Sequence, residues 1–337
     1  MGRVGCDART RTRDPAVGAG GRPLRAQADA ARRRRGRGGH RRRIAAAARV
    51  RRAARRPIPA RLALGGIPAL AVAYLHEAAG PQRAGIAAGA YVAATSVGGL
   101  AGRIVAAPVG ELVGWRLSLE VLGILAAALT ALFAVLLPPT DEHRPVPLDI
   151  SLRTLGRQAV NRRALPLYAI GAMVVGAMVA VFNALGFRLE AAPYFLSATA
   201  VSLVFLTYLS GTVTSRLSGA LVRRFGTRMP LVAGGVAMSV GALITLASPV
   251  ALIVFGIVLI TAGMFLAHAT ANAATARAGG SGRQHAVALY SVAYYVGSSA
   301  IGTIGAAAWT AGGWMALAGL VAALGLLVVG ASVKVRD

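Results

Sequence analysis

Two stretches of this chain, 199 residues apart, carry the same pattern of residues. The match runs without a gap through five identical pairs: Tyr91 and Tyr290, Val97 and Val296, Gly98 and Gly297, Gly114 and Gly313, and Trp115 and Trp314. Each copy lies in a long apolar segment and continues into a second one. Identity at a fixed spacing indicates that one structural unit is present twice. The chain is therefore expected to fold as two related helical bundles.

The apolar residues are gathered in blocks long enough to cross a membrane. They make up 56% of the 337 residues, and the mean hydropathy is +0.61. A helix needs roughly 17–25 apolar residues to span the hydrocarbon core. The sequence predicts an all-α membrane protein with nine spans, at Leu62–Leu75, Ile86–Pro108, Leu117–Leu137, Leu165–Phe187, Leu196–Leu217, Met229–Ala247, Val250–Ala271, Ala286–Thr310 and Trp314–Val333. A membrane protein built from two such bundles is typically a transporter whose substrate path lies between them.

Positive charge is distributed unevenly along the chain. The net charge is +26, and residues 1–60 hold +16 of it through 19 arginines and three aspartates. Nucleic-acid binding is the usual interpretation of such charge, but the remaining charge here follows the loops between predicted spans. Because positively charged loops stay on the cytoplasmic side, we expect that side to hold the C-terminus and the loops with Arg83, Arg144, Arg153, Arg157, Arg162, Arg163, Arg223, Arg224, Arg228, Arg277, Arg283, Lys334 and Arg336.

The spacing of the spans divides the chain into four parts. Residues 1–60 form an Arg-rich segment outside the membrane, and 61–138 form a partial N-terminal bundle of three helices. Residues 139–164 form a polar, basic cytoplasmic linker, and 165–337 form a C-terminal bundle of six helices. Shifting the second copy back by 199 residues places the start of the first copy before residue 1. We therefore expect an N-terminally truncated first bundle.

Residues 1–60 differ in composition from the rest of the chain. They contain no Phe, Trp, Tyr, Lys or Glu, and no apolar run of signal-peptide length. One interpretation is out-of-frame translation of GC-rich DNA or a wrongly assigned start. The others are a basic arm that binds anionic lipid or nucleic acid, and an unstructured tail without a role. We favour the first of these.

The stretch GALVRRFGTR, residues 219–228, lies in the predicted turn between the fifth and sixth spans. Gly219 and Gly226 would allow two helices to approach closely. Arg224 and Arg228 would bind carbonyl groups at helix ends and fix the orientation. The stretch resembles the loop signature of the major facilitator superfamily, G-x-L-x-D-R-x-G-R-R. It departs from that signature at Arg223, where the family has an aspartate.

Two further stretches carry the same resemblance. LGGIP at 64–68 and GGLAGR at 98–103 are similar to the fourth and fifth helices of inner-membrane drug/proton antiporters or arabinose-efflux-like permeases, and residues 289–302 to the eleventh helix. The resemblance covers nine of the family's twelve helices. By position it implies that Glu77 and Arg83 bridge to the signature loop; simple solvated charge is the alternative.

The resemblance implies a secondary active transporter of the bacterial inner membrane, monomeric, that exports a small organic solute (a drug or a sugar) by proton coupling. A non-functional remnant of such a transporter is one alternative. A membrane-anchored protein with a basic lipid- or nucleic-acid-binding arm is another. The expected partners are the lipid bilayer, the solute and protons, but no nucleic acid. Cys6 is the only cysteine, and no nucleotide-binding loop, catalytic triad or metal spacing occurs. We therefore expect no enzyme, no cofactor and no metal.

Polar side chains within the predicted spans are candidates for the wall of a substrate cavity. Tyr290, Tyr294 and Ser298 recur every four residues and share one helix face, and the repeat pairs Tyr91 with Tyr290. Packing between helices, with hydroxyls bonded to the backbone, is the alternative. Asn183 is a further cavity candidate.

Two more polar residues have two interpretations each. Arg103 lies about 25 Å along its helix from the cytoplasmic start. There it either faces the cavity and contacts an anionic solute or a helix carbonyl, or it snorkels to the outer rim. Glu111 and Glu120 are its candidate partners. His268 lies near the cytoplasmic end of its predicted span, where we expect a structural histidine rather than a proton carrier.

Overall fold

A computed structural model of the chain describes residues 94, 97–136 and 148–335. Three of the predicted site residues, Tyr91, Glu77 and Arg83, lie outside these residues, as do the Arg-rich segment 1–60 and the first predicted span. Every regular element in the described part is helical, which confirms the all-α class.

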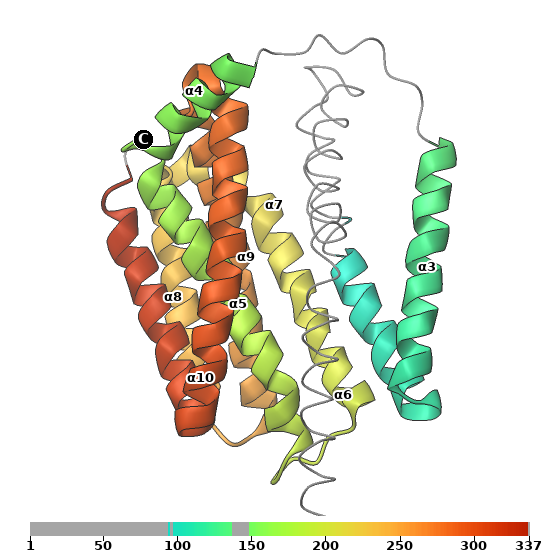
Figure 1. Cartoon of the computed structure of the whole chain (residues 1–337). Coiled ribbons are helices and arrows are strands. Elements are labelled where there is room, and N and C mark those ends of the chain that lie inside the picture. The colour runs from blue at the N-terminus through green and yellow to red at the C-terminus, as the bar shows by residue number, and fades with distance from the viewer. Residues whose placement is uncertain (1–93, 95–96, 137–147, 336–337) are drawn as a thin grey trace, which may run out of the picture. The chain divides into compact units, whose positions relative to one another are not determined.

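The elements follow one another as a series of long apolar helices (Figure 1). Within the described residues, five stretches are long and apolar enough to cross a membrane: Trp115–Leu136, Leu165–Glu190, Ala198–Phe225, Val250–Ala278 and Gly280–Ser332. Residues 97–113 are also helical. The labelled elements are α3 (Trp115–Leu136), α4 (Leu148–Ala159), α5 (Leu165–Glu190), α6 (Ala198–Leu203), η1 (Val204–Thr207), α7 (Tyr208–Phe225), α8 (Arg228–Ile244), α9 (Val250–Ala278), η2 (Gly280–Gly282) and α10 (Arg283–Ser332).

The turn that the repeat predicts occurs in both copies. Gly114 ends the helix 97–113 with φ +89°, and Gly313 interrupts α10 with φ +59°. Side chains with a Cβ rarely adopt this region, so glycine suits both turns. Trp115 and Trp314 follow directly. α10 therefore contributes two antiparallel segments, as the predicted boundary around Gly312 and Gly313 requires.

Glycines bring the helices of the C-terminal bundle into backbone contact. A Cβ on Gly234 of α8 would lie 2.6 Å from the carbonyl oxygen of Gly263 on α9, and one on Gly241 would lie 2.6 Å from that of Gly256. α5 and α10 meet in the same way, because a Cβ on Gly176 would lie 2.7 Å from the Gly297 oxygen. Lipid tails are as apolar as leucine, so close packing of small residues holds such helices together.

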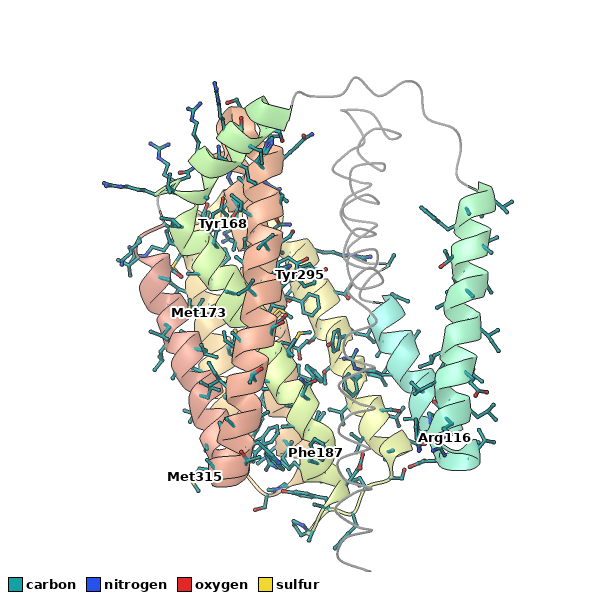
Figure 2. All side chains as sticks on the ribbon, viewed as in Figure 1. Arg116, Tyr168, Met173, Phe187, Tyr295 and Met315 are labelled. Carbon is teal, nitrogen blue, oxygen red and sulfur yellow. The ribbon has the colours of Figure 1, made fainter. Side chains whose placement is uncertain are left out.

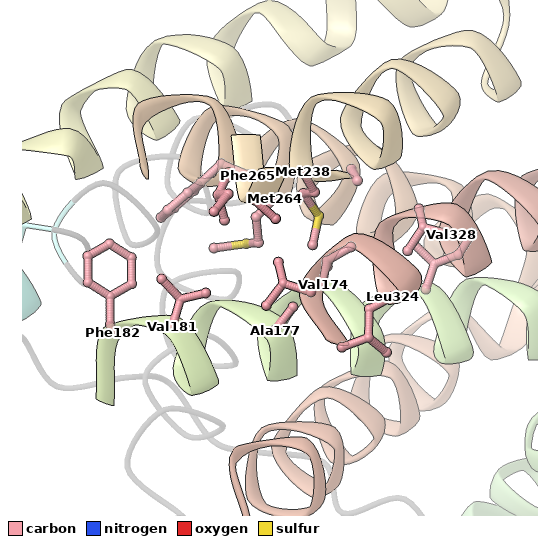
Figure 3. Packing of buried hydrophobic residues seen from close by; sticks show 14 of the residues in the cluster. Val174, Ala177, Val181, Phe182, Met238, Met264, Phe265, Leu324 and Val328 are labelled. Atoms are coloured by element: carbon pink, nitrogen blue, oxygen red, sulfur yellow. The ribbon is translucent and has the colours of Figure 1, made fainter. Parts of the chain in front are cut away.

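Apolar side chains fill the space between these backbone contacts. Val174 and Val181 of α5, Met238 of α8, Met264 of α9 and Val328 of α10 belong to one buried cluster (Figure 3). Large apolar side chains are also exposed on the outer faces of the same helices, among them Leu243, Phe255 and Leu326. This pattern of apolar residues inside and outside suits a bundle that lipid surrounds.

Two helices continue beyond the ends predicted from hydropathy. The predicted spans ended at Leu217 and Ala271, whereas α7 reaches Phe225 and α9 reaches Ala278. Polar residues end the apolar run there, but their hydroxyls bond to carbonyls of the same helix. Ser218 Oγ donates to Ser215 O at 2.6 Å, and Thr275 Oγ1 to Ala271 O at 2.8 Å. The helix thus satisfies its own polar side chains and continues.

The predicted linker contains a helix. α4 lies within residues 139–164, and three contacts attach the α4 segment to the junction of α9 and α10. Gln158 Nε2 donates to Gly279 O at 3.0 Å, Asn161 Nδ2 donates to Ala278 O at 3.1 Å, and Ser151 Oγ lies 3.0 Å from His285 Nε2. We call this end of the bundle, where α5 and α10 also begin and α7 and α9 end, the α4 end (Figure 1).

Candidate functional site

An open pocket of about 460 Å³ lies between α5 and the first segment of α10. Its wall combines apolar groups with one amide and three hydroxyls, from Val179, Asn183, Ser298, Ser299, Gly302, Thr303 and Ala306. Asn183 and Ser298 were both predicted as cavity residues. The structure brings these two together, although 115 positions separate them in the sequence.

Helical periodicity explains why these residues share one wall. Val179 and Asn183 are four residues apart on α5, and Ser298 and Gly302 are four apart on α10, so each pair lies on one face. A Cβ on Gly302 would lie 3.2 Å from Val179 Cγ1. The absence of that side chain therefore leaves room beside α5.

Two of the three hydroxyls of the pocket are already engaged within α10, whereas the amide is not. Ser298 Oγ donates to Tyr295 O at 2.7 Å, and Thr303 Oγ1 donates to Ser299 O at 2.8 Å. Their oxygens can still accept a hydrogen bond. Asn183 is exposed and makes no hydrogen bond to any described residue. It offers two donors and an acceptor to a solute in the pocket.

A second polar group lies inside the bundle, where α9 meets α10. Tyr290 is 1% exposed, and its hydroxyl oxygen lies 3.0 Å from His268 Nδ1 and 3.1 Å from His268 O. The ring of Tyr294 stands edge-to-face to His268, with centroids 5.4 Å apart. A Cβ on Gly171 of α5 would lie 2.5 Å from Tyr290 Cε2, so only glycine leaves room for this ring. The hydroxyl of Tyr290 thus faces His268.

The longer helix α9 changes the position of His268. The predicted span ended at Ala271, three residues after His268, whereas α9 continues to Ala278. Ten residues of α9 follow His268, about 15 Å of helix at 1.5 Å per residue. His268 appeared close to the end of the helix because polar residues occur in the sequence well before α9 ends.

Arg103 lies on the helix 97–113 with its side chain exposed. Its guanidinium donates to Gly99 O at 3.2 Å and lies 4.8 Å from the centre of the Phe205 ring. The carboxylate of its predicted partner Glu111 instead accepts hydrogen bonds from the hydroxyl and the backbone N–H of Thr199. The hydroxyl bond, followed by the N–H bond, lowers the pKa of Glu111. No contact between Arg103 and Glu120 is recorded among the described residues.

The signature stretch is mostly helix rather than turn, which corrects the predicted placement. Gly219 and Arg224 belong to α7, Gly226 with φ +76° ends that helix, and Arg228 begins α8. The helix continues past Gly219 because Ala220, Leu221 and the two arginines that follow Val222 favour helix, and it ends where Gly226 adopts a positive φ. Arg224 is exposed, with its guanidinium 5.1 Å from the centre of the Phe225 ring.

Two arginines of the bundle, Arg216 and Arg188, were not predicted as site residues. Arg216 lies nine residues before the end of α7, about 14 Å of helix, with its side chain exposed. A charge so far inside a spanning helix is usually functional. The serines and threonines before and after Arg216 could have indicated its place, because their hydroxyls bond to carbonyls of α7 and allow the helix to continue past Leu217.

The second is Arg188, at the end of the bundle opposite to α4. It donates to Thr245 O at 2.6 Å and to Ala247 O at 3.3 Å, where α8 ends. Its guanidinium lies 4.6 Å from the centre of the Trp314 ring, and Trp314 Nε1 donates to Thr245 Oγ1 at 2.8 Å. Figure 2 shows Phe187 and Met315 towards this end and Tyr168 towards the α4 end. Arg188 and Trp314 thus connect α5, α8 and α10.

No group of three or more His, Cys, Asp or Glu side chains suited to a metal ion occurs in the described part of the chain.

Comparison with known proteins gives several relatives. The chain is 31% identical over 264 residues to the MFS-type transporter YybF of Bacillus subtilis, which covers 77% of this chain and 65% of the relative. It is 32% identical over 263 residues to the inner membrane transport protein YnfM of Escherichia coli, covering 77% and 63%. It is 27% identical over 277 residues to a transporter of Buchnera aphidicola from Schizaphis graminum, covering 82% and 67%.

The matched region spans about two thirds of the length of these relatives. No protein-family model matches the chain. The names of the relatives describe transporters and no enzyme, in agreement with the sequence analysis.

Proposed function

We propose, from the premise that this chain belongs to the major facilitator superfamily of transporters, that it acts in secondary active transport across the bacterial inner membrane. The transported molecule would be a small organic solute, a drug or a sugar, and its movement would be coupled to protons in the direction of efflux. The premise rests on the relatives. The solute and the coupling are the proposed part.

The pocket between α5 and α10 is the observation that supports this proposal most. It lies within two spanning helices, and its polar groups are an amide and three hydroxyls without a charge. Such a wall suits a solute that carries hydroxyl or amide groups, because each can exchange hydrogen bonds with water for hydrogen bonds with the wall. Gly302 and Val179 add the apolar surface that a ring or alkyl part would cover.

We also propose that the α4 end faces the cytoplasm. Exposed arginines gather there: Arg153 and Arg157 on α4, and Arg162, Arg163, Arg223, Arg224, Arg228 and Arg283 nearby in the fold. At the opposite end, Arg188 is engaged by the carbonyls of Thr245 and Ala247. Basic residues favour the cytoplasmic side of a membrane. The C-terminus would then also be cytoplasmic, with the signature stretch between α7 and α8 acting as part of a gate.

A flux assay tests the proposal. The chain is reconstituted into liposomes, a pH gradient is imposed, and a panel of labelled drugs and sugars is offered. We expect at least one solute to accumulate only while the gradient lasts, and an ionophore that removes the gradient to abolish accumulation. Absence of gradient-driven flux across the whole panel would contradict the proposal.

A further inference from the structure

The contact between His268 and Tyr290 offers two acceptors to a single hydroxyl proton when Nδ1 carries no hydrogen. The Tyr290 oxygen lies at hydrogen-bonding distance from two atoms of His268, Nδ1 at 3.0 Å and the backbone oxygen at 3.1 Å. A tyrosine hydroxyl has one proton to donate and can also accept. Which bonds form therefore depends on whether Nδ1 carries a proton.

Two hydrogen-bond arrangements fit the same positions of the heavy atoms, and the second is open both to the imidazolium and to the neutral tautomer with its hydrogen on Nδ1. When Nδ1 is bare, the Tyr290 hydroxyl donates to it. When Nδ1 carries a proton, Nδ1–H donates to the tyrosine oxygen, and the hydroxyl turns to donate to His268 O. In the second state both short distances are hydrogen bonds. A rotation of one hydroxyl is thus enough to accommodate a proton on His268, without movement of α9 or α10.

The surroundings hold the pair in place. Gly171 of α5 leaves just the space that the Tyr290 ring fills, as its missing Cβ would stand 2.5 Å from that ring. The rings of Tyr290 and Tyr294 lie 5.5 Å and 5.4 Å from the His268 ring, centre to centre. Tyr294 meets the His268 ring edge-to-face, so the two tyrosine rings enclose the imidazole and fix its position.

Other titratable groups on the packed helices do not contact the imidazole in the described structure. α7 carries Arg216 at a similar distance from the α4 end, and α5 carries Tyr168, whose hydroxyl donates to Gln158 O at 3.2 Å. α8 has no titratable side chain after Arg228. Only Tyr290 and Tyr294 of α10 lie against the ring.

Carboxylates are nearly absent from this half of the chain. Across α5 to α10 the only one is Glu190, the last residue of α5. His285 lies at the start of α10 and faces Ser151 of α4. Among the described helices α5 to α10, His268 is therefore the one histidine inside a span, and imidazole is the side chain that most readily binds and releases a proton near neutral pH.

We infer that His268, with Tyr290 as its hydrogen-bond partner, is a proton-binding site of the transport cycle. The inference rests on the proposed proton-coupled transport and adds the residue that carries the proton in this half. The proton enters as H⁺ at Nδ1 of a neutral imidazole whose Nε2 carries the other hydrogen, and it leaves from the same atom, so charge balances over a cycle. The Tyr290 hydroxyl changes its acceptor at each step and keeps its own proton.

The first test needs no solute. The chain is labelled with ¹⁵N-histidine, reconstituted into liposomes and examined by solid-state NMR between about pH 5 and 8. The His268→Gln variant assigns the signals, and His285→Gln is the matched control. We expect the His268 signals to change from neutral imidazole to imidazolium as the pH falls. A His268 ring that stays neutral throughout overturns the inference, whatever the solute proves to be.

Tyr290→Phe provides the second variant. It keeps the ring that packs on Gly171 but removes the hydroxyl, so the pH at which His268 changes state should move while the bundle stays folded. An unchanged titration in this variant contradicts the role of Tyr290 as the partner.

The third test separates this inference from the proposed function. With a solute found in the flux assay, we expect the flux of His268→Gln to be the same with and without an imposed pH gradient, while His285→Gln keeps the dependence of the original chain. If His268→Gln retains full gradient dependence, the site is overturned and the transport proposal stands. If the original chain shows flux without any gradient dependence, proton coupling fails together with the site.

Discussion

Asn183 is a polar residue in the otherwise apolar middle of α5. It is exposed in a pocket of about 460 Å³, and no described residue bonds to its amide. Several hydroxyls of the spans bond to a carbonyl of their own helix, as that of Ser298 does to Tyr295 O. The side chains of Asn183 and Ser299 make no hydrogen bond in the described structure, so these two groups of the pocket are free to bind a solute.

Replacing Asn183 with leucine should weaken solute binding without weakening the fold. A hydrogen bond to a neutral partner is worth about 1 kcal/mol and an unsatisfied partner costs about 1–3 kcal/mol, so we expect affinity to fall by roughly tenfold. Binding and flux are measured on reconstituted protein. The control is Thr310→Val, which removes a hydroxyl of α10 outside the pocket. Equal losses in both variants would argue against a role of the pocket.

Arg188 should contribute to stability rather than to transport. It donates to two carbonyls at the end of α8 and stacks on Trp314. Hydrogen bonds from a charged donor contribute about 1.5–3 kcal/mol, so Arg188→Ala should lower the free energy of unfolding by that order. Thermal unfolding in detergent measures it. Arg163→Ala, which removes an exposed side chain, should change little, and a similar loss there would contradict the assignment.

At the scale of the helix, glycine contacts determine which helices can pack together. α8 and α9 meet at Gly234 with Gly263 and at Gly241 with Gly256, where a Cβ would lie 2.6 Å or less from a carbonyl oxygen. Contacts this short leave no room for a side chain. The two backbones are therefore in direct contact along their shared length.

A valine at Gly241 should separate α8 from α9. Overpacking of this kind costs about 1–3 kcal/mol, so the unfolding temperature should fall clearly. Gly319→Ala is the matched control, because nothing lies within 4 Å of a Cβ at that position in α10. That variant should be as stable as the original or more so, since alanine favours helix over glycine by about 1 kcal/mol. A stable Gly241→Val protein would show that the two helices can move apart freely.

α4 should move with the C-terminal bundle because Gln158 and Asn161 fasten it to the α9–α10 junction. Replacing both with leucine removes the bonds to Gly279 O and Ala278 O. Hydrogen–deuterium exchange of the α4 amides should then become faster, while exchange in α8 stays the same. Arg157→Gln, on the exposed side of α4, serves as control. Unchanged exchange in the double variant would mean that other contacts hold α4.

For the whole molecule, the proposed orientation gives a direct labelling test. In a Cys6→Ser background, Ser281→Cys introduces a thiol at the α4 end and Ser248→Cys one at the opposite end, and both positions are exposed. A maleimide that cannot cross membranes should label the second and not the first in intact spheroplasts. Lysis should make the first reactive. The reverse pattern would place the α4 end outside the cell.

The sequence predicted several features correctly. Blocks of apolar residues predicted the all-α membrane class, because a backbone in lipid has to satisfy its hydrogen bonds within helices. The repeat predicted the paired turns at Gly114 and Gly313, since glycine at a sharp turn is visible in sequence. Periodicity of four put Tyr290, Tyr294 and Ser298 on one helix face; Ser298 lies at the pocket, whereas Tyr290 is buried beside His268 and lies outside the pocket wall. These features depend on local chemistry.

Other features depended on which surfaces meet in three dimensions. The ends of α7 and α9 lie beyond the fall in hydropathy because Ser218 and Thr275 bond within their own helices. α4 is held by contacts with residues more than 100 positions away. Neither relation can be read from the order of residues alone.

The sequence by itself thus determined the membrane class, the duplication and the polar candidates, because these follow from composition, spacing and local backbone preference. Only the tertiary structure decided which of these polar side chains lie close together. It set Asn183 beside Ser298, and it turned Tyr290 towards His268 against Gly171. The physical reason is that close packing assigns each side chain its neighbours, and a hydrogen bond or a proton site exists only where two chemical groups are brought within about 3 Å.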